Sequence, residues 1–266
     1  MNIVVITGTG TGVGKTVTTA ALAACALRAG QRVAVVKPVQ TGVRPGEPGD
    51  LAEVGRLTGV TDLHELVRYA EPLAPATAAR RVGESGPDLD ELAGKIAVLT
   101  DRDLVLVEGA GGVLVRFNDQ DEGICELVSA VEELVRFQHG DGETPRVRVV
   151  LVTSAGLGCL HDTAAAAKAL QDWGLGPQHL VVGDWPAAPG LAERCNLADL
   201  ASYGGAPVRG VLPHGAAELD ATSFAEMAMA RLTPALGGVL DAPDFIRAHA
   251  APLHSCPRFP ERRART

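Results

Sequence analysis

The sequence is poor in aromatic residues and in cysteine. Aromatic side chains make up only 3% of the 266 residues, whereas apolar residues reach 46%. A core with few rings must be built from Val, Leu, Ile and Ala, the residues of a buried parallel sheet flanked by helices. The five cysteines are scattered, and no two are spaced as a metal-binding pair. This usage is typical of free thiols in a reducing cytoplasm.

Long apolar segments and an excess of basic residues are also absent. No apolar run approaches about 18 residues without a charge or a turn signal, so we expect no membrane span. The N-terminus begins with a strand and not with the basic head and apolar run of a signal peptide, which predicts a cytoplasmic protein. The net charge of −8 argues against nucleic acid as the main partner. It leaves nucleotides open, because a local site can be basic on an acidic protein.

Short apolar strands alternate with helical segments along most of the chain. The expected strands are 2–6, 32–36, 103–107, 147–152, 180–182 and 208–212, and the expected helices are 17–28, 51–57, 89–99, 126–137 and 162–173. This alternation predicts an α/β fold with a three-layer, doubly wound, mostly parallel sheet. Ligands of such sheets bind at the carboxyl ends of the strands. Residues that directly follow the strands are therefore the candidates for a site.

Two stretches fit this alternation less well. Residues 118–145 contain one helical piece and then a polar turn over 139–143, which is typical of a surface excursion. From residue 234 onward prolines are frequent, and the chain ends in several arginines. We therefore expect residues 1–233 to form the domain and residues 234–266 to form a weakly ordered C-terminal extension.

A glycine-rich loop runs from Gly8 to Thr16, between the first strand and the first helix. Backbone N–H groups of such a loop wrap phosphates, and the helix N-terminus adds positive charge. Lys15 is placed to reach the terminal phosphates, and the Thr16 hydroxyl is placed to coordinate Mg²⁺. Five residues separate Gly8 from Gly14 where the usual pattern has four, so the loop is a variant. With this loop, the predicted fold is of the P-loop NTPase type. The alternative is a plain glycine-rich turn with an incidental lysine.

Three charged residues follow other predicted strands or loops. Lys37 is a point charge suited to phosphate or carbamate, or else a surface lysine at a strand exit. Asp50 is either a helix N-cap or a Mg²⁺ ligand. Glu108 ends an apolar strand, where a carboxylate is costly unless it is paired or metal-bound, although a purely structural role is the alternative. Thr16, Asp50 and Glu108 together would make a hard oxygen site for one Mg²⁺.

These motifs together resemble the dethiobiotin synthetase family. The resemblance rests on the loop with its variant spacing, on 37–42, on 50–51 and on 107–112, and it extends more weakly to cover about residues 1–230. It implies an ATP-dependent cyclo-ligase that joins CO₂ to 7,8-diaminopelargonate, closes the ring of dethiobiotin and releases ADP and phosphate. It also implies a homodimer whose partners are small molecules, with no nucleic acid and no membrane.

The resemblance further implies a role for each site residue. Lys15 and Lys37 would be catalytic, and Thr41, Gly111 and Gly112 would contact the diamine. Thr16, Asp50 and Glu108 would hold Mg²⁺. The implied ATP-binding residues are Gly12, Val13, Gly14, Lys15, Thr16, Val17, Asp50, Glu108, Gly109, Ala110, Gly111, Gly183, Asp184, Pro213, His214 and Gly215.

Several positions depart from the family pattern. Gly12 stands where many relatives carry Glu, and Gly183 stands where many carry an Asn that reads adenine. His161-Asp162 replaces a common Asn-His pair near the diamine. Base preference and diamine binding therefore stay open, as does a relative with a changed amine substrate or no activity.

Two other classes of protein share the predicted fold. A partitioning or positioning ATPase that binds DNA or membrane carries an additional lysine early in the loop, and this loop has only Gly, Thr and Val before Lys15. An amidotransferase-linked amide synthetase brings a glutaminase domain, for which this chain has no room. Both are less consistent with the sequence than the dethiobiotin synthetases.

Overall fold

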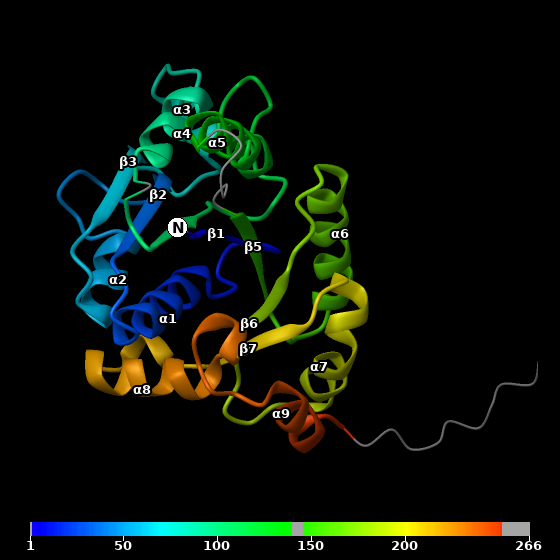
Figure 1. Ribbon diagram of the computed structural model, residues 1–266. Coiled ribbons are helices and arrows are strands. Elements are labelled where there is room, and N and C mark those ends of the chain that lie inside the picture. The colour runs from blue at the N-terminus through cyan, green and yellow to red at the C-terminus, as the bar shows by residue number, and fades with distance from the viewer. Residues whose placement is uncertain (1, 100, 140–145, 252–266) are drawn as a thin grey trace, which may run out of the picture.

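The computed structural model describes residues 2–99, 101–139 and 146–251. These residues form a seven-stranded sheet in the order β3-β2-β4-β1-β5-β6-β7 (Figure 1). The strands are β1 (Asn2–Gly8), β2 (Val33–Thr41), β3 (Leu63–Tyr69), β4 (Leu104–Glu108), β5 (Arg146–Thr153), β6 (His179–Trp185) and β7 (Val208–Pro213). Every neighbouring pair in this sheet is parallel. The predicted doubly wound α/β fold is confirmed.

Helices cover both faces of the sheet. One layer contains α1 (Lys15–Arg28), α2 (Asp50–Thr58) and α8 (Ala221–Arg231), which contact one another. The other contains α3 (Pro75–Arg81), α4 (Leu89–Ala97), α5 (Ile124–His139), α6 (Cys159–Asp172) and α7 (Leu191–Gly204) (Figure 1). Side chains of β1 alternate between the two cores, with Ile3 and Val5 in one and Val4 and Ile6 in the other. The central strand β1 is therefore buried on both faces, as is typical of a parallel sheet.

Four of these elements were missing from the sequence prediction, namely β3, α3, α7 and α8. Strand β3 shows the physical reason most clearly. It lies at the edge of the sheet and is only partly buried, so its sequence Leu-His-Glu-Leu-Val-Arg-Tyr mixes apolar and charged residues. A half-exposed edge strand lacks the continuous apolar run that marks the central strands.

Residues 234–251, the described part of the extension predicted over 234–266, contain regular structure where weak order was predicted. Residues 234–236 form the 3₁₀ turn η2 (Pro234–Leu236), and residues 242–249 form helix α9 (Ala242–His249). Prolines lie in the first turn of both, a position that tolerates proline, so their frequency did not signal disorder here. The predicted arginine-rich end lies outside the described residues, as do positions 140–143 of the predicted polar turn.

Helix α9 packs on the end of β6 through an aromatic cluster. The ring centroids of Phe245 and Trp185 lie 6.2 Å apart in an edge-to-face arrangement, and Phe245 stacks on His249 at 3.9 Å. The side chain of Asp241 caps the helix by accepting from the backbone N–H of Asp244. The described C-terminal segment is thus part of the domain.

Phe245→Ala should lower the free energy of unfolding by about 3 kcal/mol, because it removes a ring that is only 9% exposed. The midpoint and slope of a urea titration measure the change. Phe137→Ala is the matched control, since that ring is 87% exposed and its loss should cost no more than about 0.5 kcal/mol. Equal effects of the two substitutions would contradict the packing of α9.

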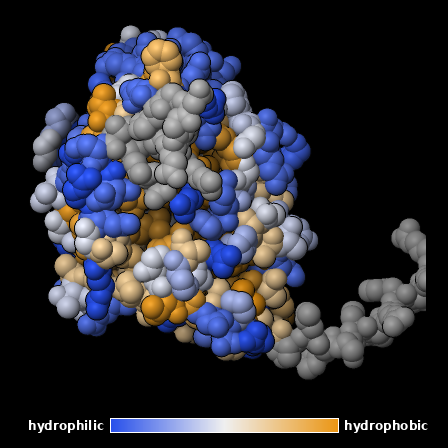
Figure 2. All heavy atoms as spheres, in the orientation of Figure 1, coloured by the Kyte–Doolittle hydropathy of each residue, from blue (hydrophilic) through white to orange (hydrophobic). Residues whose placement is uncertain are grey.

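Among the described residues, the cysteines are free and the surface is of mixed polarity, as the composition predicts. Cys25, Cys125, Cys159 and Cys195 are free thiols. Hydrophilic and hydrophobic residues are interspersed on the face shown in Figure 2. In the part of the chain that the structure describes, no helix combines the length and the apolar character needed to cross a bilayer.

Candidate active site

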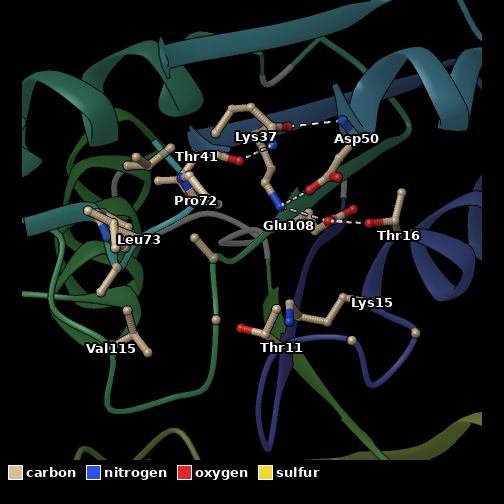
Figure 3. Close-up of a pocket in the computed structure, with 18 of the residues that line it drawn as sticks. Thr11, Lys15, Thr16, Lys37, Thr41, Asp50, Pro72, Leu73, Glu108 and Val115 are labelled. Atoms are coloured by element: carbon tan, nitrogen blue, oxygen red, sulfur yellow. Dashed lines mark hydrogen bonds and ion pairs between the residues drawn. The ribbon is translucent and has the colours of Figure 1, made fainter. Parts of the chain in front are cut away.

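A cavity of about 700 Å³ opens at the carboxyl ends of β1, β2 and β4 (Figure 3). Many of the residues predicted from the sequence line it together, although they come from segments far apart in the chain. They are Gly12, Gly14, Lys15, Thr16, Val17, Lys37, Thr41, Asp50, Glu108, Ala110 and Gly111. Val13, Gly109 and Gly112 belong to the same two loops but do not line this cavity.

The loop between β1 and α1 is fixed by backbone contacts on both sides. The N–H of Thr9 donates to the carbonyl of Val152 on β5, and the N–H of Val113 donates to the carbonyl of Gly8. Gly12 and Gly14 have φ of 76° and 93°, a left-handed conformation that favours glycine. The shape of the loop is therefore set before any ligand binds.

Strand β6 forms the back wall of this loop. A Cβ atom on Gly183 would lie 2.1 Å from the carbonyl oxygen of Val13, and one on Gly14 would lie 2.4 Å from the carbonyl oxygen of Gly183. The two backbones thus approach each other closely, with no room for a side chain. Gly183 has a steric role here that its comparison with an adenine-reading Asn did not suggest.

Lys15 lies at the start of α1 and turns back into the loop. Its ammonium donates to the carbonyl of Gly10 at 2.7 Å. Burial and the nearby Lys37 lower the pKa of Lys15 to about 8, against the opposing effect of Glu108 and Asp50. A phosphate in the loop would offer this ammonium a stronger partner than the carbonyl does.

A buried cluster of charges lies beside the loop, where Figure 3 shows Lys37 pointing between two carboxylates. The Lys37 ammonium is 2.5 Å from Oδ2 of Asp50 and 2.8 Å from Oε1 of Glu108. Thr16 donates its hydroxyl to the same Oε1 at 2.9 Å. Burial opposes the charge of Lys37, but the carboxylates of Glu108 and Asp50 outweigh it and raise the pKa of Lys37.

The structure rules out one alternative each for Lys37 and Asp50. Lys37 is only 3% exposed, so it is not a surface lysine. The N-cap of α2 is Gly49, and Asp50 is the first helical residue with its carboxylate turned toward Lys37. Glu108 is completely buried, and its Oε2 has no hydrogen-bond partner among the described residues.

The donor set of this cluster fits a hard divalent cation. Mg²⁺ is bound by one or two carboxylates, by hydroxyl or phosphate oxygens and by water. Asp50, Glu108 and Thr16 supply such oxygens within one cluster. A buried carboxylate oxygen without a partner is costly, and a cation would remove that cost. No ligand other than oxygen is needed.

The remaining predicted nucleotide residues lie at the ends of β6 and β7. Asp184 and His214 face each other across these two strands, with Oδ1 and Nδ1 2.9 Å apart. The N–H of His214 donates to the carbonyl of Trp185. Gly183, Pro213 and Gly215 flank this pair, behind the loop and outside the main cavity. His161 and Asp162 lie exposed in the first turn of α6 and do not line the main cavity either.

The structure also adds residues that the sequence did not indicate. Pro72, Leu73, Ala74 and Pro75 connect β3 to α3 and line one side of the cavity, and Val115 lies near them (Figure 3). They form an apolar wall on the side of the cavity away from Asp50 and Thr16. Residues 72–75 follow strand β3 and could have been identified by that position. They were not, because β3 itself was not predicted from the sequence.

Comparisons with known proteins agree with this geometry. The family model described as "AAA domain" matches residues 2–128, which include the loop, Lys37, Asp50 and Glu108. An ATP-dependent dethiobiotin synthetase BioD from Frankia casuarinae is 53% identical over 246 residues, covering 92% of this chain and 98% of that protein. The synthetase of the same name from Streptomyces avermitilis is 49% identical over 251 residues, covering 93% and 99%.

A third relative, from Mycobacterium leprae, carries the same name and is 45% identical over 232 residues, covering 86% of this chain and 95% of its own. All three alignments span nearly the whole of each relative. The similarity in sequence and the cavity that contains the phosphate loop and its charged neighbours both indicate the same family. The chain belongs to the ATP-dependent dethiobiotin synthetases, and it is a ligase of biotin biosynthesis.

Proposed function

We propose that this enzyme joins CO₂ to 7,8-diaminopelargonate and closes the cyclic urea of dethiobiotin, with conversion of ATP to ADP and phosphate. One observation carries the proposal: the buried Lys37 lies between the phosphate loop and an apolar wall, in a single cavity. A diamine with an alkyl chain needs an apolar surface, and its carbamate needs a cation. The names of the relatives support the same reaction.

The chemistry divides into three steps. One substrate amine attacks CO₂ and loses a proton, giving a carbamate anion. A carbamate oxygen then attacks the γ-phosphorus of ATP, and the bond from this phosphorus to the β,γ-bridging oxygen breaks to release ADP. Finally the second amine attacks the carbamate carbon and expels phosphate, which closes the ring. The substrate supplies both nucleophiles, so the protein's task is positioning and electrostatic stabilisation.

The residues of the cavity are suited to these steps. Lys15 would hold the terminal phosphates, and Lys37 with the Thr41 hydroxyl would hold the carbamate. Mg²⁺ on Thr16, Asp50 and Glu108 would neutralise charge on the phosphate oxygens. Gly111 and Gly112 would lie against the diamine, whose alkyl chain would contact the wall at 72–75.

The nucleotide would extend from the loop toward the ends of β6 and β7. The residues proposed to bind ATP are 12–17, Asp50, 108–111, Gly183, Asp184 and 213–215. Because Gly183 has no side chain, the base would be read by Asp184, by His214 and by backbone groups. We place the enzyme in the cytoplasm as a homodimer acting on small molecules. The apolar side chains of Leu114 and Leu157, exposed on the loops after β4 and β5, support a protein contact at this edge.

Phosphate release from ATP, with Mg²⁺ and bicarbonate, should be strongly stimulated by 7,8-diaminopelargonate. Label from bicarbonate should then enter an acid-stable product, because a cyclic urea does not lose CO₂ in acid as a carbamate does. The control omits the diamine. ATP hydrolysis that is indifferent to the diamine would refute this reaction and leave a nucleotide-dependent switch or another amine substrate.

A further inference from the structure

The ammonium of Lys37 has all of its hydrogen-bonding capacity in use. It donates to Oδ2 of Asp50, to Oε1 of Glu108 and to the carbonyl of Gly109 at 3.2 Å. An ammonium has three hydrogens, so these contacts account for all of them. Lys37 cannot bind a substrate anion in addition to these groups. It must first leave at least one of them.

Two of these partners are also the carboxylates of the proposed metal site. Oε1 of Glu108 is 2.9 Å from the Thr16 hydroxyl oxygen. Oxygens that bind one Mg²⁺ at about 2.1 Å in octahedral geometry lie about 3 Å from their nearest fellow ligands, so these two atoms are spaced as neighbouring ligands. The same Oε1 accepts from Lys37 at 2.8 Å. A divalent ion and an ammonium at one buried oxygen repel each other strongly.

We propose that Lys37 is an internal substitute for the divalent cation: it holds Asp50 and Glu108 together until the metal binds, and the metal then displaces its ammonium into the cavity toward the substrate. This inference rests on the proposed metal site. It gives Lys37 two successive roles, positioning the metal ligands and then contacting the carbamate. It also sets an order, in which the substrate anion meets a free Lys37 only after the metal is in place.

The surroundings of Lys37 allow this movement. The residue lies within β2, whose backbone is fixed by pairing with β3 and β4, so only the side chain has to move. Its flexible four-carbon stem lets the ammonium shift by rotation about side-chain bonds. The side chain already lines the cavity, together with Thr41 and Gly111. The positive charge therefore passes from one buried set of oxygens to an adjacent open space.

The competing arrangement keeps Lys37 where it is. The metal would then bind through Oε2 of Glu108, which has no partner, while Oε1 stayed with Lys37. The Thr16 hydroxyl argues against it, because this third oxygen lies beside Oε1. The two arrangements predict opposite effects of removing the lysine. Metal affinity rises if Lys37 is a competitor, and it stays the same or falls if Lys37 supports the ligands.

Binding of Mn²⁺ alone to the nucleotide-free enzyme, measured by electron paramagnetic resonance, separates these outcomes. Lys37→Met should bind Mn²⁺ at least tenfold more tightly than the wild type. Lys15→Met is the matched control: it removes a second buried cation from the same cavity, but one bonded to the Gly10 carbonyl and not to the carboxylates. Its effect should be clearly smaller than that of Lys37→Met, because Lys15 acts on Glu108 and Asp50 only through space and makes no hydrogen bond to them. Unchanged or weaker binding by Lys37→Met would overturn the inference while leaving the metal site standing. No Mn²⁺ binding by any of the three proteins, even with ADP, would reject the metal site and the inference with it.

A measurement on the wild type covers the case in which Lys37→Met does not fold. Reductive methylation, followed by mass spectrometry of the peptides, reports the accessibility of each lysine. Saturating MgCl₂ should raise labelling of Lys37 at least fivefold over NaCl of equal ionic strength. The exposed Lys95 should be labelled equally in both salts. No change at Lys37 under saturating MgCl₂ would show that the metal does not displace it.

Discussion

Lys37→Met should lower the rate of product formation by about a hundredfold to a thousandfold, the usual effect of removing one preorganised charge-stabilising group. The reason is electrostatic. The carbamate and the transferring phosphoryl group both carry negative charge, and Lys37 is a buried cation placed between the phosphate loop and the apolar wall. Rates with saturating ATP, diamine and bicarbonate measure the effect, and circular dichroism shows whether the fold survives.

The control for this substitution is Lys95→Met, which removes an exposed lysine that pairs with Glu91 on α4. Its rate should equal that of the wild type. The variant at Lys37 should also lose about 3 kcal/mol of stability in metal-free buffer, because Glu108 is left buried without its cationic partner. A Lys37→Met enzyme with near-normal turnover would remove this lysine from the mechanism.

Gly183→Ala should be strongly destabilising. The added Cβ would lie 2.1 Å from the carbonyl oxygen of Val13, and both partners are backbone, so neither can rotate away. We expect a loss of about 3 kcal/mol or more from overpacking. For a chain of this size that corresponds to a decrease in Tm of about 6–12 °C. Nucleotide affinity should fall as well, because the loop must move.

Gly10→Ala is the matched control for Gly183→Ala, because it lies in the same loop with nothing within 4 Å of an added Cβ and no positive φ. Thermal unfolding without nucleotide should give a Tm within about 2 °C of the wild type, as for ordinary surface changes. Comparable decreases for both variants would mean that the loop is sensitive to any side chain, and would contradict a specific contact with β6.

The central features of the fold and of the site could be predicted because their signals are local. Each of β1, β2 and β4 contains a short apolar run, and the residue types that bind phosphate or metal follow directly after these runs. Lys37 and Glu108 were identified in this way, and the structure brings them within 2.8 Å of each other. Their partnership itself was not predictable, since they are separated by the whole of β3 and its neighbouring helices.

The features that were missed depend on contacts or on partial burial. Strand β3 carries charges because it is an edge strand, and it was therefore not predicted. Without it, the apolar wall formed by 72–75 could not be predicted either. The role of Gly183 depends on a backbone approach to Gly14, far away in the sequence, that no local pattern encodes. The prolines near residue 234 indicated disorder because the sequence alone does not show that Phe245 packs on Trp185.

That packing has a consequence for the growing polypeptide. The phosphate loop is synthesised well before its back wall at Gly183. Helix α9 is made later still, and it packs on Trp185, which lies two residues after Gly183 on β6. Although domains tend to fold from the N-terminus during synthesis, this loop cannot take its final shape early. A nascent chain therefore has its glycine-rich segment without the supporting contact until β6 has been made.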